Sequence, residues 1–174
     1  MYVNGLRLIL EFLDTSRTEK DEVARALFDH LISLDDVNCN IFVYTSGQAM
    51  TPLTDAMQTG QFYFADRLMI DGFVDISTFN LDHFRFTPES LHTLKLLHYL
   101  GYRFPNNFFT SNRPSSDTHD ELFAEFCSWL ESESNNVMDL KNLVRIHIRK
   151  RYGRKLSDIV SNLPDLIKKF LLLN

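Results

Sequence analysis

The clearest pattern of apolar and polar positions lies near the C-terminal end of the chain. Four apolar residues there have the spacing of one helical face: Leu140, Leu143, Val144 and Ile148. Asp139 can cap the start of this helix, and Gly153 can end it. A second short helix is expected at 156–160, and a third at 165–172, which Pro164 would open. The pattern therefore predicts three short helices in this segment.

The third of these helices carries more apolar residues than so short an element can bury alone: Leu166, Phe170, Leu171 and Leu173. A segment of this size also has little core of its own. We therefore expect the C-terminal helices to dock on another surface.

A pair of helices is predicted within residues 47–77. Thr51 can cap a first helix that Pro52 opens, and Gly60 can end it. The apolar face of the first helix comprises Leu53, Ala56 and Met57, and that of the second comprises Phe64, Ala65, Leu68 and Met69. Gly72 can end the second helix.

Weaker helical patterns flank this pair. Before it, a helix is expected at 23–34, with residues 6–13 as its partner helix. The apolar face of the helix at 23–34 comprises Val23, Leu27, Leu31 and Leu34. After the pair, four leucines at helical spacing predict a helix that ends at Gly101: Leu91, Leu94, Leu97 and Leu100.

Residues 105–118 are polar and predict a loop. Thr118 and Glu121 form a capping box for a further helix. The apolar residues of that helix are Leu122, Phe123, Phe126, Trp129 and Leu130. We expect it to cap the open end of the helical stack and to seat the C-terminal helices, with 131–136 as a short polar hinge.

Composition and charge add two expectations. At 174 residues, 44% hydrophobic and 24% charged, the chain has the composition of a globular protein, and its fifteen phenylalanines indicate aromatic-rich packing. Residues 1–138 hold 9 Lys and Arg against 20 Asp and Glu, a net charge of −11, whereas residues 139–174 hold 9 against 3, a net charge of +6. This asymmetry indicates that the two segments meet different partners.

The cysteines bear on the compartment. Cys39 and Cys127 have no paired spacing, which indicates a reducing compartment and predicts a cytoplasmic location, with the nucleus as the alternative. Arg7 and Glu11 interrupt the apolar stretch at the start of the chain, so neither a signal peptide nor a membrane span is expected there.

The sequence assembles no catalytic or metal site. The six histidines lack metal-ligand spacing, and neither a phosphate-binding loop nor a nucleophile elbow occurs. Neither cysteine has the basic neighbours that would mark a nucleophile. A basic run at 141–155 could bind nucleic acid, but it shares its helix with the apolar stripe and lacks interleaved aromatics. A solvated face on a docking helix is therefore the favoured interpretation, and no catalytic residue, metal or cofactor is expected.

Two segments resemble known modules. Residues 47–77 resemble one ankyrin repeat over nearly its full length, including the helix-capping Thr51, although Thr54 stands where that family prefers His. The flanking helices resemble degenerate or truncated repeats. The resemblance implies a short, degenerate ankyrin-repeat stack over residues 1–105, followed by a loop and a capping helix at 106–137.

Residues 138–174 resemble a SOCS box, the three-helix module that recruits elongin B, elongin C and a cullin to a ubiquitin ligase. Leu140, Val144 and Ile148 stand at the Leu, Cys and aliphatic positions of the family pattern. The pattern continues with Ile148-Arg149, Gly153, Ile159, Leu163-Pro164 and the closing run from Ile167 to Leu172.

Three positions depart from that pattern. Asp139 replaces a small hydroxyl residue, and Val144 replaces the Cys. The Leu-Pro-aliphatic-Pro element that contacts the cullin reads Leu163-Pro164-Asp165-Leu166 here, without the second Pro. Asp165 puts a carboxylate where an apolar side chain would press on the cullin, so it is expected to face water or to meet a cation.

The chain is identified by these resemblances as a member of the ankyrin repeat and SOCS box family, with an all-α fold. The family implies a non-catalytic substrate-recognition subunit of an elongin B/C–cullin-RING ubiquitin ligase, which acts by proximity. The implied elongin C contacts are Leu140, Leu143, Val144 and Ile148, and the implied cullin contacts are Leu163, Pro164 and Leu166. Cullin five, with its RING protein, is favoured over cullin two, and the ankyrin surface would hold an unknown protein substrate.

Two other interpretations stay open. In one, the ankyrin stack is a protein-binding scaffold without a ligase, and the C-terminal helices only cap it. In the other, the chain is a small hydrolase or a nucleic-acid factor, which is disfavoured because no site assembles. Co-purification with elongins separates the ligase subunit from the scaffold.

Overall fold

The computed structural model of the protein describes residues 22–33, 43–45, 48–71, 74–76, 79, 81, 84, 86–105, 108, 119–135, 140–153 and 159–172. Several predictions lie outside these residues: the helix at 6–13, the cap at Asp139, the helix end at Gly72, the capping residue Thr118, and most of the loop at 105–118 and of the helix at 156–160.

The described part of the chain is built from helices and one short β hairpin. The elements in chain order are α2 (Glu22–Ser33), β1 (Val43–Thr45), β2 (Gln48–Met50), α3 (Pro52–Gln58), α4 (Phe62–Ile70), α5 (Ser90–Tyr99), α7 (Asp120–Asn135), α8 (Leu140–Tyr152) and α10 (Asp165–Leu172). The helical architecture agrees with the predicted all-α class. The hairpin was not predicted; it is antiparallel, with Val43 opposite Met50 and Thr45 opposite Gln48.

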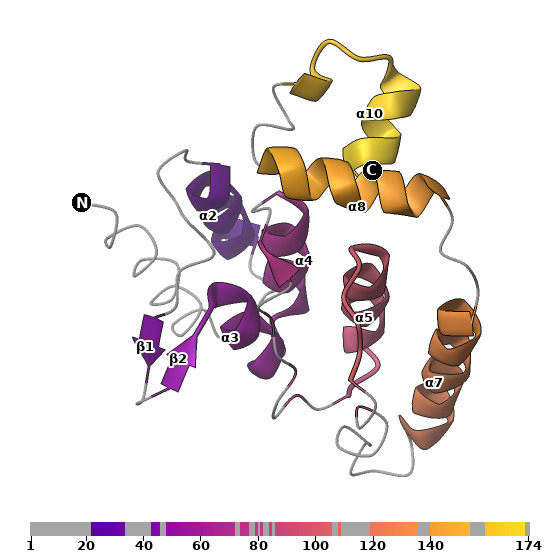
Figure 1. Ribbon diagram of the computed structural model, residues 1–174. Coiled ribbons are helices and arrows are strands. Elements are labelled where there is room, and N and C mark those ends of the chain that lie inside the picture. The colour runs from indigo at the N-terminus through magenta and orange to yellow at the C-terminus, as the bar shows by residue number, and fades with distance from the viewer. Residues whose placement is uncertain are drawn as a thin grey trace.

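The helices from α2 to α7 form a body, and the C-terminal helices lie at one end of it. Helix α4 packs between its neighbours, since it contacts α2, α3 and α5. Helix α8 runs across the ends of α4 and α5, and α10 lies on the other side of α8 (Figure 1). We call α8, α10 and the segment between them the C-terminal module.

Helices α3 and α4 form as their sequences predict. The Thr51 hydroxyl accepts a hydrogen bond of 3.2 Å from the Thr54 backbone N–H, and Pro52 is the first helical residue. Gly60 has a φ of 74° just after α3. The buried residues of the pair include every one that was predicted: Leu53, Ala56, Met57, Phe64, Ala65, Leu68 and Met69. Local signals are therefore sufficient for this unit.

Helix α2 forms, but the prediction of its buried face was wrong for Val23 and Leu27. Leu31 packs partly buried against the core, as predicted, and Leu34 lies outside the described residues. Val23 and Leu27 are 67% and 51% exposed. The buried face is instead Ala24, Phe28 and Ile32, one residue along, which turns the helix by about 100°. Phe28 is fully buried with its ring centroid 4.5 Å from that of Phe64 on α4. An aromatic pair buries more surface than Leu27 would, and it sets the rotation of the helix.

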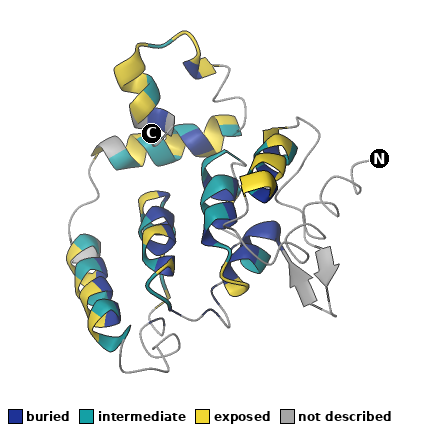
Figure 2. Ribbon diagram, turned by 180° about the vertical axis from the view of Figure 1, so that it is seen from behind, coloured by how far each residue is buried: buried dark blue, intermediate teal, exposed yellow. Residues whose placement is uncertain are grey.

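Aromatic side chains fill the core between α5 and α7, as the phenylalanine count predicts. Phe123 and Phe126 of α7 meet Phe86, Phe104 and Phe108 with ring centroids 5.0 to 6.4 Å apart. The buried side of α7 faces α5 and its flanking segments (Figure 2). Helix α7 thus covers the α5 end of the body, as expected of a capping helix.

The predicted polar hinge at 131–136 was wrong for most of its length, because α7 continues to Asn135. Leu130 is buried in the body, so the last buried turn of α7 is anchored. Glu131 and Ser132, the next two residues, are exposed on the continuing helix and do not break it.

A pH dependence of stability is expected from the contact between α5 and α7. The His98 ring lies 5.3 Å from the Trp129 ring, centroid to centroid. Burial lowers the pKa of His98 below its ordinary value of 6.5, although Glu133 acts in the opposite direction. The unfolded chain therefore binds this proton more readily, so the free energy of unfolding is expected to fall as the pH drops below about 6.5 and to be retained above it.

Urea denaturation at pH 7.5 and pH 5.5 checks this expectation. His98→Gln should reduce the difference between the two free energies of unfolding, whereas His147→Gln, at an exposed position of α8, should not. An equal pH dependence in wild type and His98→Gln would contradict the assignment.

Candidate protein-docking surface

Helix α8 has two sides with different surroundings. Its inner side meets the body at Gly101, just after α5, where Ile146 Cδ1 lies 3.0 Å from the position that a Cβ atom would occupy. On the same side, Arg149 is only 8% exposed and reaches the end of α4. The predicted end of α8 at Gly153 is confirmed, with a φ of 51°. The body thus holds α8 at two points.

The outer side of α8 carries the predicted apolar stripe. Leu140 is 72% exposed, and Leu143 and Val144 are also exposed. We call these three residues the docking stripe. The exposed residues in the second half of the helix are His147, Lys150, Arg151 and Tyr152. The exposed positions of α8 are therefore apolar in its first half and mostly basic in its second. Figure 2 shows exposed positions along the helix.

Ile148, the fourth residue of the predicted stripe, has a different environment. It is half-buried against a small core that Val160 and Leu171 form inside the C-terminal module, and Leu163 packs there too. Leu163, an implied cullin contact, therefore also belongs to the inside of the module. This core fastens α10 to α8, so the docking stripe stands on a packed unit.

The start of α10 presents a second exposed apolar site. The helix begins at Asp165 as predicted, directly after Pro164. Pro164 is exposed, and Leu166 is 82% exposed. The Asp165 side chain faces water with its carboxylate 3.5 Å from Lys168 Nζ, which confirms the expectation that it is not buried unpaired. Pro164 and Leu166 are thus open to a partner.

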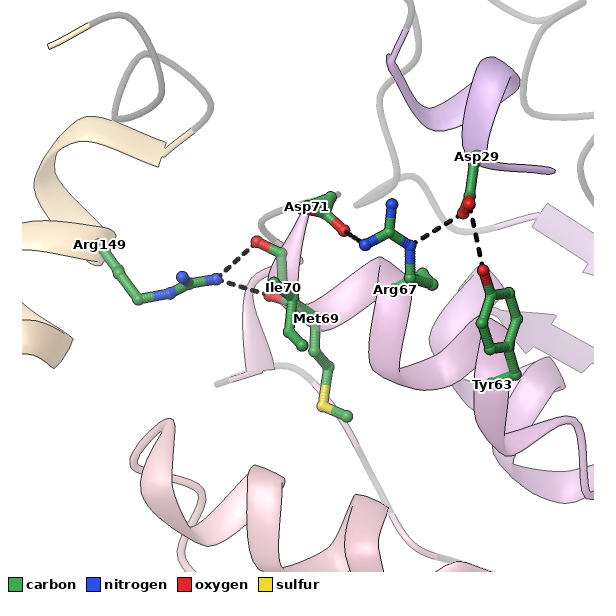
Figure 3. A network of polar contacts seen from close by, with 7 residues as sticks. All are labelled: Asp29, Tyr63, Arg67, Met69, Ile70, Asp71 and Arg149. Carbon is green, nitrogen blue, oxygen red and sulfur yellow. Dashed lines mark hydrogen bonds and ion pairs between the residues drawn. The ribbon is translucent and has the colours of Figure 1, made fainter. Parts of the chain in front are cut away.

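Arg149 is the residue of this region that sequence analysis missed, because it was assigned to a solvated basic face. Its Nη2 donates to the carbonyls of Met69 and Ile70, both at 2.8 Å (Figure 3). Its Nη1 donates to the carbonyl of Leu171 at 3.4 Å. A helical-face analysis could have indicated its burial, since it lies one turn beyond Ile146, away from the docking stripe.

An ion-pair network lies beside the end of α4, within the body. Arg67 on α4 pairs with Asp71 and, through Nε, with Asp29 on α2 at 2.8 Å (Figure 3). The Tyr63 hydroxyl donates to the other Asp29 carboxylate oxygen at 3.1 Å. Burial raises the pKa of Asp71, while Arg67 and Arg149 act to lower it. The network links α2 to α4 beside the attachment point of α8.

Two observations on the described residues bear on metal and thiol chemistry. The described residues contain no group of three or more His, Cys, Asp or Glu side chains placed to hold a metal ion. Burial raises the pKa of the Cys127 thiol to about 11, which makes it a poor nucleophile at neutral pH. Within the same residues, no helix combines the length and apolarity needed to cross a membrane.

Comparison of the chain with protein-family models, with curated proteins and with solved structures finds no significant match.

Proposed function

We propose that this protein is a non-catalytic substrate-recognition subunit of an elongin B/C–cullin-RING ubiquitin ligase. The observation that carries the proposal is the docking stripe of Leu140, Leu143 and Val144, which is exposed on a helix that the body holds at two points. Large apolar side chains that stay exposed in a row are a common mark of a protein interface. The stripe has the helical spacing that the resemblance to a SOCS box implies for elongin C.

Each partner has its own part of the C-terminal module in this proposal. Elongin C, bound to elongin B, covers the docking stripe, and the half-buried Ile148 supports it from beneath. A cullin contacts Pro164 and Leu166 at the start of α10, with Leu163 holding that turn in place. The solvated Asp165 leaves this contact weaker than the full family motif would make it, and cullin five stays the favoured choice over cullin two.

The body would hold the protein substrate. Helices α3 and α4, joined by a short turn and flanked by α2 and α5, support an ankyrin-like stack with α7 as its cap. A subunit of this kind raises the local concentration of a substrate lysine near the ubiquitin-conjugating enzyme, so it needs no catalytic residue.

Titration of the purified chain with the elongin B–C complex tests the proposal. Leu140→Ala is expected to weaken binding at least about tenfold, or about 1.4 kcal/mol, because it truncates an apolar anchor. Leu27→Ala is the matched control, since Leu27 is an exposed leucine on α2 and should leave the affinity unchanged. Wild-type affinity in Leu140→Ala, or no elongin binding by the wild-type chain, would refute the proposal.

The attachment of α8 to the body supports a second candidate function, that of a protein-binding scaffold without a ligase. Arg149 and Ile146 pack the C-terminal module over the ends of α4 and α5, as an end cap would be packed. In that case the body still binds its partner protein, while the docking stripe binds no elongin. The same titration separates the two candidates.

A further inference from the structure

Arg149 joins three parts of the structure that are distant in the sequence. One terminal nitrogen of its guanidinium group donates to two carbonyls at the end of α4 (Figure 3). The other terminal nitrogen donates to the Leu171 carbonyl near the end of α10. The donor and its Met69 acceptor are 80 residues apart. A single side chain on α8 thus connects the body to the last helix of the module.

The acceptors suit a guanidinium group for two reasons. The last four carbonyls of a helix have no partner within that helix, and Met69 and Ile70 are the last two residues of α4. The C-terminal end of a helix also carries partial negative charge, which attracts a cation. The Asp71 carboxylate adds further negative charge at the same place. A planar group with several N–H donors in fixed directions can satisfy such a set of oxygens at one relative orientation of the two helices.

The free-energy cost of burying Arg149 indicates that this residue orients the C-terminal module more than it stabilises the fold. Burial lowers the pKa of Arg149 to about 10. The folded protein therefore disfavours the charged form of the guanidinium group, although the group stays protonated at neutral pH. Burying a charge costs free energy that its new hydrogen bonds largely offset. Other contacts, such as Ile146 against Gly101, also attach α8 to the body. Apolar contacts of this kind do not require the alignment that hydrogen bonds require.

We propose that Arg149 is a positioning residue that sets the angle at which the body holds the C-terminal module. The docking stripe lies on the same helix, so the directional hydrogen bonds of this guanidinium group set its angle to the body, while Ile146 against Gly101 holds the helix close. The contacts of Arg149 lie within the chain itself. A fixed orientation of the bound substrate relative to the ligase would follow from them, and this consequence rests on the proposed function.

Distance measurement between two spin labels tests the inference on the full chain. In a background with Cys39→Ser and Cys127→Ala, labels are placed at the exposed positions His92 on α5 and Lys150 on α8 through cysteine substitutions. Wild-type Arg149 is expected to give one narrow distance distribution. Arg149→Met keeps a long side chain but donates no hydrogen bond, and it should broaden the distribution at least about twofold while circular dichroism shows a folded body.

Arg151→Met is the matched control. Arg151 is another arginine of α8; it is exposed, and its guanidinium lies 5.9 Å from the ring centroid of Tyr152 on the same helix, so its loss should leave the distribution narrow. A distribution in Arg149→Met as narrow as in the wild type overturns the inference. If Arg149→Met fails to fold, Arg149→Lys decides: its ammonium cannot span the three carbonyls, so a broadened distribution supports the inference and a narrow one overturns it.

Elongin titration of the same variants separates this inference from the proposed function. The docking stripe is intact in Arg149→Met, so its affinity for the elongin B–C complex should stay within about threefold of the wild-type value, well below the tenfold loss expected at an anchor. A wild-type chain that binds no elongin would refute the proposed function, whereas the distance distributions alone decide the role of Arg149.

Discussion

Phe126→Ala is expected to lower the free energy of unfolding by about 3–5 kcal/mol, the usual range for removing a buried aromatic ring. Phe126 is fully buried, and its ring packs against Phe86, Phe104 and Phe108 at centroid distances of 6.0 to 6.2 Å. Its other neighbour is the Trp129 ring, stacked at 5.6 Å. Truncation would leave a cavity that four rigid rings cannot close.

Urea denaturation measures this loss, and the single tryptophan of the chain, Trp129, reports it by fluorescence. Phe126→Leu should cost less, because it keeps much of the apolar volume. Tyr99→Ala is the control, since that ring also packs beside Trp129 but is exposed. A loss below about 1 kcal/mol in Phe126→Ala would mean that the aromatic core does not hold α7 in place.

Gly101→Val is expected to destabilise the protein by about 3 kcal/mol and to loosen the C-terminal module. Gly101 has a φ of 90°, where a β-branched residue is strained. A Cβ atom there would also lie 3.0 Å from Ile146 Cδ1, and valine adds two methyl groups beside this contact. The substitution therefore strains the backbone and pushes against the helix that carries the docking stripe.

Gly60→Val separates these two effects. Gly60 has a φ of 74°, but nothing lies within 4 Å of the position that a Cβ atom would occupy there, so this variant has the backbone strain alone. Hydrogen exchange should accelerate across α8 in Gly101→Val and stay at the wild-type rate there in Gly60→Val. Equal exchange of α8 in both variants would show that the contact with Ile146 does not hold the helix.

Elements whose signals are local could be predicted from the sequence. The cap at Thr51, the glycine ends at Gly60 and Gly101, and the start of α10 at Asp165 each depend on a few neighbouring residues. The exposed stripe on α8 follows from helical spacing. The residues that cap a helix or end it act on neighbours within a few positions, so these helix boundaries can be predicted from the local sequence.

Features that depend on distant partners could not be predicted. The rotation of α2 is set by Phe28 against Phe64, on another helix. Ile148 leaves the apolar stripe because Leu171 covers it. The helical position of Arg149 indicates its burial but not its acceptors, which are the last two carbonyls of α4. In each case, the periodicity of the sequence indicates which face of a helix is apolar or charged. Only the tertiary fold decides which other residues contact that face.

The 80-residue separation between Arg149 and Met69 has a consequence for synthesis on the ribosome. Chains emerge N-terminal end first, and contacts between distant residues form late. Helix α4 is complete long before Arg149 has been translated, so the final carbonyls of α4 remain hydrated while α5 and α7 emerge. The body therefore folds with one end still open to water, and the arrival of α8 closes it.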